Sequence, residues 1–230
     1  GEKNAVKYAD EIIVLSKGVQ DYFKNEYNRD TRFIPNGVNK PEVVEAQEIK
    51  KWGLEKDNYI LYLGRIVPEK GEHYLIKAFK QIKTNKKLVI AGGISDTADY
   101  GKELKELAAD DNRIVFTGFV QGRILDELYS NAYIYCLPSD LEGMPLSLLE
   151  AMSYGNCCLV SDIPECTEVV EDKAITFKKS NVEDLKDKLQ DACEHPEKVN
   201  ELKAQASDFI CSKYNWDVIV NETMKLYGRN

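Results

Sequence analysis

The segment that decides the fold runs Ser139-Asp140-Leu141-Glu142-Gly143-Met144-Pro145-Leu146-Ser147-Leu148-Leu149-Glu150. It follows a strand-like apolar run. Pro145 suits the first turn of a helix, and Gly155 suits the position just after its last turn. The segment therefore predicts a strand, a tight loop that carries Glu142, and a helix that carries Glu150 two turns later.

The two glutamates indicate chemistry as well as structure. Glu150 interrupts an apolar helix face formed by Leu148, Leu149 and Met152. A carboxylate on such a face costs several kcal/mol unless something pairs with it. A helical glutamate more commonly lies on a solvated face, so Glu150 by itself leaves that alternative open. Together with Glu142, it indicates a site for an anionic ligand that carries many hydroxyl groups.

The order of elements predicts the fold class. Apolar runs alternate with stretches such as Glu72–Ile82, whose apolar residues recur with helical period. Continuous apolar strands separated by helices indicate a parallel sheet covered on both faces, which is a doubly wound, Rossmann-like α/β domain. The predicted strands are Ile12–Leu15, Arg32–Pro35, Tyr59–Leu63, Lys87–Ala91, Arg113–Phe116, Ala132–Leu137, Cys157–Val160 and Ala174–Phe177.

Glycines and charged residues follow several of these strands. Doubly wound sheets bind ligands at the carboxyl ends of their strands, where loops run into helices. The loops in question contain Gly64-Arg65, Lys70-Gly71, Gly92-Gly93, Gly118-Phe119-Val120 and the run from Ser139 to Pro145. Because these loops meet at one edge of the sheet, we predict a single pocket there.

The loop Gly64-Arg65-Ile66-Val67-Pro68-Glu69-Lys70-Gly71 carries two cations. Arg65 offers a planar fork for phosphate oxygens, and Lys70 offers a mobile point charge at the start of a helix, where an anion is favoured. One phosphate can use one of these groups, whereas a diphosphate can use both. The alternative is a pair of solvated loop cations.

Composition excludes several classes of function. The 230 residues are 43% hydrophobic, which is enough for a core, and no apolar run is long enough to span a membrane. A net charge of −8 argues against nucleic acid or an anionic membrane as the main partner. The six cysteines and two histidines lack ligand spacing, so no metal is expected. With no secretory signal at residues 1–4, we expect reduced cysteines and a cytoplasmic protein.

The segment from Pro138 to Gly155 resembles the motif of retaining glycosyltransferases of the GT-B fold, family 4. That motif has a glutamate, seven residues, a second glutamate, Ala-Met and a closing glycine. The loop Gly64–Gly71 is similar to the family's diphosphate-binding loop. Further resemblance lies in Pro35–Val38, Phe116–Val120, Ser161–Glu168 and the closing stretch Trp216–Tyr227.

The resemblance implies a role for each matching residue. Arg65 and Lys70 hold the donor diphosphate and stabilise it as a leaving group without a metal or other cofactor. Glu142 meets the hydroxyls of the donor hexose, Glu150 accepts hydrogen bonds from the ribose, and Val120 contacts the base through its backbone. Glu142, Arg65 and Lys70 are thus the expected catalytic residues. The other implied donor-binding residues are Gly64, Ser139, Gly143, Met144 and Leu146, with Glu168 in a supporting place.

The resemblance also implies a domain organisation. Residues 1–38 correspond to the last strand-helix-strand unit of an N-terminal acceptor domain, 39–214 to the donor domain, and 215–230 to a helix that crosses back. We expect the strand Ile12–Leu15, buried on both faces, to lie outside the main sheet and to pack with that helix in a small lobe. Its uncovered apolar surface favours self-association or contact with a missing domain.

The implied function is the donor-binding domain of a retaining glycosyltransferase that moves a hexose from a nucleoside-diphosphate sugar. A glycan or lipid-linked acceptor binds through the missing domain, and the inner membrane face is a second possible location for the full-length enzyme. One alternative is a non-catalytic donor-binding or partner-binding subunit that needs a separate acceptor domain. Another is a different GT-B chemistry, such as epimerisation of a nucleotide-sugar or phosphorolysis.

Overall fold

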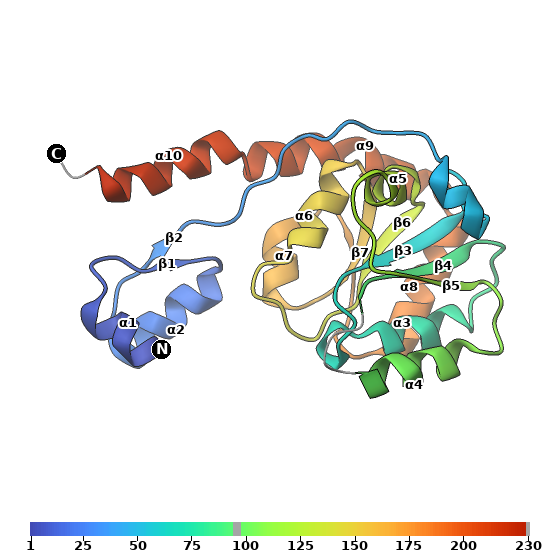
Figure 1. Cartoon of the computed structure of the whole chain (residues 1–230), viewed down its shortest axis with the longest axis horizontal. Coiled ribbons are helices and arrows are strands. Elements are labelled where there is room, and N and C mark those ends of the chain that lie inside the picture. Colours follow the sequence, from blue (N-terminus) through green and yellow to red (C-terminus); the bar gives the residue numbers. More distant parts are fainter. Residues whose placement is uncertain (94–97, 229–230) are drawn as a thin grey trace.

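A parallel sheet forms the centre of the main domain (Figure 1). The computed structural model describes residues 1–93 and 98–228. The six strands lie in the order β5-β4-β3-β6-β7-β8, and every neighbouring pair is parallel. They are β3 (Tyr59–Leu63), β4 (Lys87–Ala91), β5 (Ile114–Gly118), β6 (Ile134–Leu137), β7 (Cys157–Ser161) and β8 (Ile175–Phe177). The predicted doubly wound α/β class is confirmed.

Helices cover both faces of this sheet. Figure 1 shows α3 and α4 on one side of it and α5 and α6 on the other. The helices of the domain are α3 (Glu72–Phe79), α4 (Ala98–Ala108), α5 (Arg123–Asn131), α6 (Leu146–Ser153), α7 (Pro164–Val170), α8 (Val182–Glu194) and α9 (Pro196–Lys213). Two short 3-10 helices, η1 (Glu48–Trp52) and η2 (Pro68–Lys70), precede β3 and α3.

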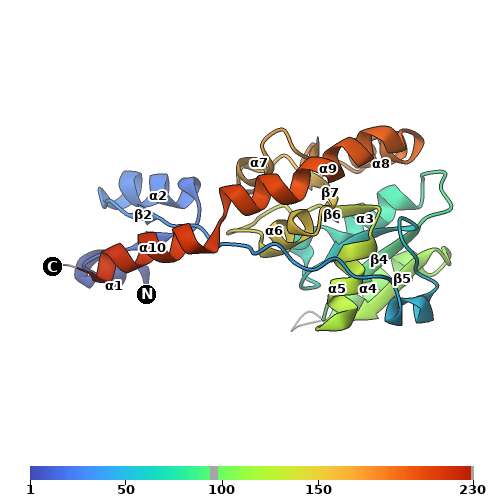
Figure 2. The same ribbon diagram turned by 90° about the horizontal axis from the view of Figure 1, so that it is seen from above.

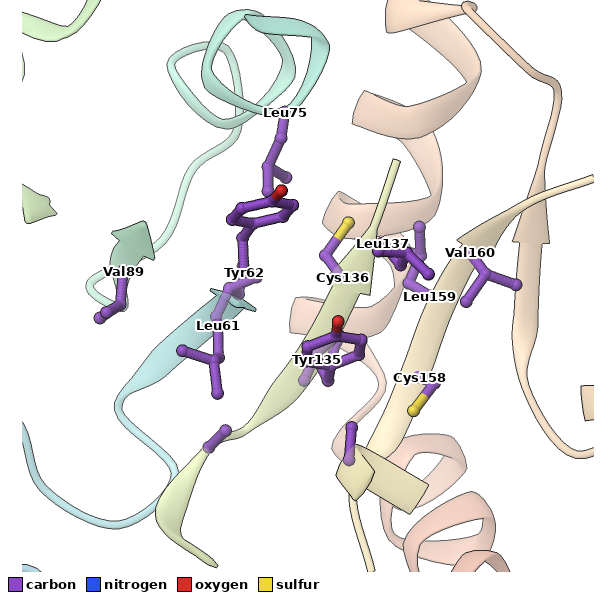
Figure 3. Packing of buried hydrophobic residues seen from close by; sticks show 14 of the residues in the cluster. Leu61, Tyr62, Leu75, Val89, Tyr135, Cys136, Leu137, Cys158, Leu159 and Val160 are labelled. Atoms are coloured by element: carbon purple, nitrogen blue, oxygen red, sulfur yellow. The ribbon is translucent and has the colours of Figure 1, made fainter. Parts of the chain in front are cut away.

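The core lies between the sheet and its helices. Each strand at the centre of the sheet is apolar along its whole length, because both of its faces are covered. Figure 3 shows Leu61 and Tyr62 of β3 beside Tyr135 and Cys136 of β6, with Cys158 of β7 next along the sheet. All five of these side chains are fully buried. The buried cysteines therefore act as small apolar residues, and burial raises the pKa of the Cys158 thiol well above its ordinary value.

The strand order creates a crevice at one place. The chain runs outward from β3 to β4 and β5, and then returns so that β6 pairs with the opposite side of β3. Loops that leave β3 and β6 therefore diverge to opposite faces of the sheet. In open parallel sheets such a switch point, at the carboxyl ends of the strands, is where ligands bind. The two loops with the strongest sequence motifs flank this point.

A small lobe stands beside the main domain. It contains α1 (Glu2–Tyr8), β1 (Ile13–Val14), α2 (Lys17–Tyr27) and β2 (Arg32–Phe33), and β1 and β2 form a two-stranded parallel sheet of their own. The last helix, α10 (Trp216–Tyr227), leaves the main domain and extends alongside this lobe (Figures 1 and 2). The final residues of the predicted range 215–230, namely 229–230, lie outside the described part of the chain.

The chain passes between the lobe and the main domain twice, first around Val38 and again around Asn215, and these two crossings lie side by side. The N–H of Val38 donates to the Tyr214 carbonyl oxygen at 2.9 Å, and Val38 forms a parallel bridge with Asn215. Gly37 lies against the ring of Trp216 so closely that a Cβ atom would come within 2.5 Å of it. A glycine is therefore required where the first crossing passes over the start of α10.

Much of the apolar surface of the lobe is open. We predicted that Ile12–Leu15 would be buried on both faces, and this prediction was wrong: Ile13 and Leu15 are 40% and 42% exposed. Val14, between them, is only 4% exposed, so the strand is buried on one face and open on the other. Apolar residues of α10, such as Val218 and Met224, are 60% exposed. Within residues 1–93 and 98–228, no helix combines the length and apolar character needed to cross a bilayer.

Candidate donor-binding site

A pocket of about 720 Å³ opens at the switch point between β3 and β6. The loop after β3 and the loop after β6 form its walls, and the first turn of α6 forms one end. Most of the residues predicted to bind a donor line it: Gly64, Arg65, Lys70, Glu142, Gly143, Met144 and Leu146. Glu69, Leu141, Pro145 and Ser147 complete the lining.

Backbone contacts hold the two loops together. Asp140 donates its N–H to the Glu69 carbonyl oxygen at 2.8 Å, which ties the β6 loop to η2. Gly71 adopts a left-handed conformation with φ +74°, and a Cβ atom there would lie 2.1 Å from the Pro138 carbonyl oxygen. Both features demand glycine. The close approach fixes Lys70, the preceding residue, against the β6 loop.

Lys70 and Glu142 meet at the floor of this pocket. The Lys70 Nζ atom donates to both carboxylate oxygens of Glu142, at 2.6 and 2.7 Å. The Ser139 hydroxyl donates to the same carboxylate at 2.7 Å, and Ser139 is itself fully buried. Glu142 is therefore a buried carboxylate whose charge is balanced by Lys70 and whose orientation is set from two directions.

Arg65 is placed differently from Lys70. Its side chain is exposed, and within the described residues it forms no ion pair. Its backbone is held, because the Tyr62 hydroxyl donates to the Arg65 carbonyl oxygen at 2.9 Å. Below the loop lies Glu72, fully buried, whose carboxylate accepts a hydrogen bond from the Tyr100 hydroxyl at 3.0 Å. Burial raises the pKa of Glu72 to about 7.

Glu150 lines an adjoining pocket of about 390 Å³, which lies between α5, α6 and the first chain crossing. Leu146 lines both pockets and connects them. Glu150 as a whole is exposed, but its carboxylate accepts a hydrogen bond from the buried Tyr129 hydroxyl at 3.0 Å. Desolvation raises the pKa of the Glu150 carboxyl, and the hydrogen bond from Tyr129 opposes that rise.

The remaining loops form a separate hollow, so the prediction of a single pocket was wrong. Gly92, Gly93, Gly118 and Phe119 line a third pocket of about 250 Å³ between the loops after β4 and β5. Side chains such as Ile66 line this hollow as well. The loops do end at one edge of the sheet, but the residues between them divide the space.

Three predicted residues do not line the first two pockets. Ser139 is fully buried and contacts the site through its hydrogen bond to Glu142. Val120 packs against the hydrophobic core, next to Phe119 of the third pocket. Glu168 lies on α7, and its backbone carbonyl accepts a hydrogen bond from Lys213. The structure thus brings together the residues predicted to contact the diphosphate and the hexose, and it places Glu150 in the adjoining pocket. Glu168 lines neither pocket.

Sequence reasoning missed three neighbours of the site. Glu72 and Tyr129 have no motif around them, because each acts through a contact with a distant segment. Asn36 donates its backbone N–H to the Met144 sulfur at 3.1 Å, which brings the first chain crossing against the β6 loop. A glutamate in the first turn after Lys70-Gly71, at a position that the helical period buries, was the one available signal for Glu72.

Comparison with known proteins identifies the family of this chain. Residues 44–209 match the family model of the glycosyl transferases group 1. The chain belongs to this family. A relative that is 30% identical is an uncharacterized glycosyltransferase of Methanocaldococcus jannaschii, with 94% of this chain and 59% of the relative covered. The O-antigen chain mannosyltransferase RfbU of Salmonella typhimurium is 29% identical, with 94% and 58% covered.

Solved structures share the fold. The crystal structure of Anabaena HepE in complex with UDP and glucose matches 99% of this chain and 65% of its own, with a TM-score of 0.90 at 19% identity. Sucrose-phosphate synthase from Thermosynechococcus elongatus matches 98% and 59%, with a TM-score of 0.84 at 25% identity. The fold is that of the Rossmann-like C-terminal half of GT-B glycosyltransferases. The chain spans less than two thirds of the length of each of these four proteins.

Proposed function

We propose that this chain is the donor-binding part of a retaining, family 4 glycosyltransferase that moves a hexose from a nucleoside-diphosphate sugar to a glycan or lipid-linked acceptor. The observation that carries the proposal is the pocket at the β3–β6 switch point. One wall supplies Arg65 and Lys70, and the other supplies Glu142 and the start of α6. Two cations and a helix N-terminus suit a diphosphate, and a fixed carboxylate suits sugar hydroxyls.

The proposed chemistry follows from charge. When the bond between the anomeric carbon and the diphosphate oxygen breaks, its electron pair stays on the diphosphate and positive charge develops on the sugar ring. Arg65 and Lys70 stabilise the diphosphate, and Glu142 lies on the side of the sugar. The acceptor hydroxyl then attacks from the face that the diphosphate leaves, and its proton passes to the departing phosphate. This sequence retains the anomeric configuration.

The contacts of Glu142 support a positioning and electrostatic role over a nucleophilic one. Lys70 occupies both carboxylate oxygens, and Ser139 adds a further hydrogen bond to one of them. A carboxylate held by three donor contacts is a poor nucleophile, because three of its roughly four lone-pair sites are engaged, and the site left on Oε2 suits a sugar hydroxyl. We also propose that the reaction needs no metal, since Arg65 and the start of α6 stabilise the diphosphate together with Lys70, whose charge Glu142 partly balances.

The experiment measures the thermal midpoint of the chain with UDP, GDP, ADP and their hexose conjugates. At about 100 times the dissociation constant, a ligand adds about 2.7 kcal/mol of stability. For a chain of this size that raises the midpoint by roughly 5–10 °C. We expect one base to give this rise, with EDTA leaving it unchanged. A panel without any rise would contradict the proposal.

Retention is tested on the full-length protein with its acceptor. Proton NMR of the product distinguishes the two anomers through the coupling at the anomeric carbon. The proposal predicts that the product has the same anomeric configuration as the donor. Inversion would overturn the mechanism while leaving donor binding intact.

A further inference from the structure

Glu150 is held at the rim of its pocket by a residue of another helix. Its carboxylate has one hydrogen-bond partner in the described part of the chain, the Tyr129 hydroxyl of α5, which lies 3.0 Å from Oε2. The other oxygen, Oε1, is left to accept hydrogen bonds from a ligand. Tyr129 and Glu150 both line the pocket of about 390 Å³ that adjoins the diphosphate pocket.

Tyr129 is a rigid support. The residue is 1% exposed, and its ring stacks on Tyr154 with centroids 5.3 Å apart and planes 19° apart. The side chain of the buried Asn156 donates to the Tyr129 carbonyl oxygen at 2.8 Å and to the Ala151 carbonyl oxygen at 3.0 Å. This amide clamps the end of α5 to α6. The hydroxyl of Tyr129 therefore has little freedom to move relative to Glu150.

The hydroxyl of Tyr129 has two acceptors within reach. The Ser147 carbonyl oxygen lies at 3.3 Å, and the Glu150 carboxylate lies nearer and carries charge. A hydroxyl has one proton, so the shorter, charge-assisted bond dominates. Burial raises the pKa of Tyr129 well above its ordinary value, which keeps the hydroxyl protonated as a donor. A buried tyrosine that only filled the core would need the Ser147 carbonyl alone.

We propose that Tyr129 is a positioning residue for the donor ribose, because its hydroxyl holds one oxygen of Glu150 so that the other oxygen receives the ribose hydroxyls. The inference rests on the proposed function, since it takes the ligand to be a nucleotide. Without the hydroxyl of Tyr129, the exposed Glu150 side chain rotates among several rotamers. The ribose hydroxyls then lose a fixed acceptor, while the diphosphate keeps its own cations.

The test combines a substitution at Tyr129 with a nucleotide that lacks the ribose hydroxyls. The variant Tyr129→Phe removes the hydroxyl and keeps the ring. Titration calorimetry measures its affinity for the nucleoside diphosphate that binds the unchanged chain best and for the 2′,3′-dideoxy form of that nucleotide. In the unchanged chain we expect the ribose form to bind about tenfold more tightly, as for one hydrogen bond to a charged group. In Tyr129→Phe this ratio falls to roughly twofold, close to that of Glu150→Ala.

Tyr59→Phe is the matched control. Tyr59 is also buried, and its hydroxyl donates to the Leu128 carbonyl oxygen at 2.7 Å, one residue from Tyr129 on the same helix. This variant removes a buried tyrosine hydroxyl that supports α5, so it measures any general loosening of the helix. We expect it to keep the tenfold ratio of the unchanged chain.

The outcomes are distinguishable. A ratio that stays near tenfold in Tyr129→Phe overturns the inference and leaves the proposed function standing. An equal fall in Tyr59→Phe and Tyr129→Phe also overturns it, because the effect then belongs to helix packing. If no nucleotide binds the unchanged chain at all, the proposed function fails and the inference fails with it. A fall confined to Tyr129→Phe and Glu150→Ala supports it.

Discussion

The Nζ atom of Lys70 bridges both carboxylate oxygens of Glu142, at 2.6 and 2.7 Å, in side chains that are 17% and 4% exposed. The two residues come from the loops that follow β3 and β6. Their pairing closes the floor of the pocket at the switch point of the sheet. It also divides the two cations into different roles, since the charge of Lys70 is already balanced whereas Arg65 is exposed.

The first prediction concerns the stability of this pair. Lys70→Ala leaves the buried Glu142 carboxylate without its cation, so we expect a loss of roughly 3–5 kcal/mol in unfolding free energy. The double variant Lys70→Ala/Glu142→Gln removes the stranded charge and recovers much of that loss. Urea unfolding of the two single variants and the double variant measures the coupling. A loss in the double variant equal to the sum of the losses in Lys70→Ala and Glu142→Gln would show that the pair is not coupled.

The second prediction concerns ligand binding. Glu142→Gln frees the charge of Lys70, so a nucleoside diphosphate without a sugar binds roughly three- to tenfold more tightly. The hexose conjugate does not share this gain, because the carboxylate that accepts its hydroxyls is gone. Titration calorimetry with both ligands gives the two affinities. A weaker affinity for the free diphosphate would mean that Glu142 contributes to phosphate binding in some other way.

The third prediction concerns Glu72 below the Arg65 loop. Its pKa is raised from 4.5 to about 7 because it is buried, so the folded state favours the protonated form. Protonation of Glu72 therefore contributes to the unfolding free energy. This contribution is complete below pH 4.5 and is lost as the pH rises through 7. The variant Glu72→Gln does not lose this contribution, because the glutamine side chain does not titrate.

Denaturant unfolding between pH 5 and pH 8 checks this sign. We expect the unfolding free energy of Glu72→Gln, relative to the unchanged chain, to rise by on the order of 2–3 kcal/mol over that interval. His73, whose pKa burial lowers, remains in both proteins and cancels in the comparison. Parallel pH profiles would contradict the neutral, buried carboxyl.

The fourth prediction concerns the crossing between the lobe and the main domain. Gly37→Ala places a methyl group within 2.5 Å of the Trp216 ring, and overpacking of this kind costs roughly 1–3 kcal/mol. In a Trp216→Ala background the space is open, and the same substitution costs little. Unfolding free energies of the four proteins form a double-mutant cycle. An equal cost in both backgrounds would place the strain elsewhere.

The main sheet was largely predictable because its strands carry their own signal. Tyr59–Leu63 is apolar throughout and Lys87–Ala91 is apolar after its first residue, and the structure gives both strands the predicted bounds. The run Ile12–Leu15 has the same local character, but in the small lobe Val14 is buried whereas Ile13 and Leu15 are exposed. Burial there depends on which surfaces are present around the strand, and four apolar residues contain no information about that.

The candidate site was predictable in part for a similar reason. The glycines, cations and glutamates of the two loops are adjacent in sequence to the strands that position them. Lys70 and Glu142 are 72 residues apart, and Tyr129 and Glu150 are 21 apart. Such pairs depend on strand order and helix packing, which periodicity does not determine. The division of the strand-end edge into three pockets depends on side-chain packing in the same way.

The most direct test of the account compares a nucleoside with its diphosphate in the unchanged chain and in Arg65→Ala. Arg65 is the exposed cation of the pocket, and each charge-assisted hydrogen bond is worth roughly 1.5–3 kcal/mol. We predict by titration calorimetry that Arg65→Ala weakens diphosphate binding by about 10- to 100-fold and leaves nucleoside binding within about twofold. Equal weakening of both ligands, or of neither, would contradict a diphosphate site between the β3 and β6 loops.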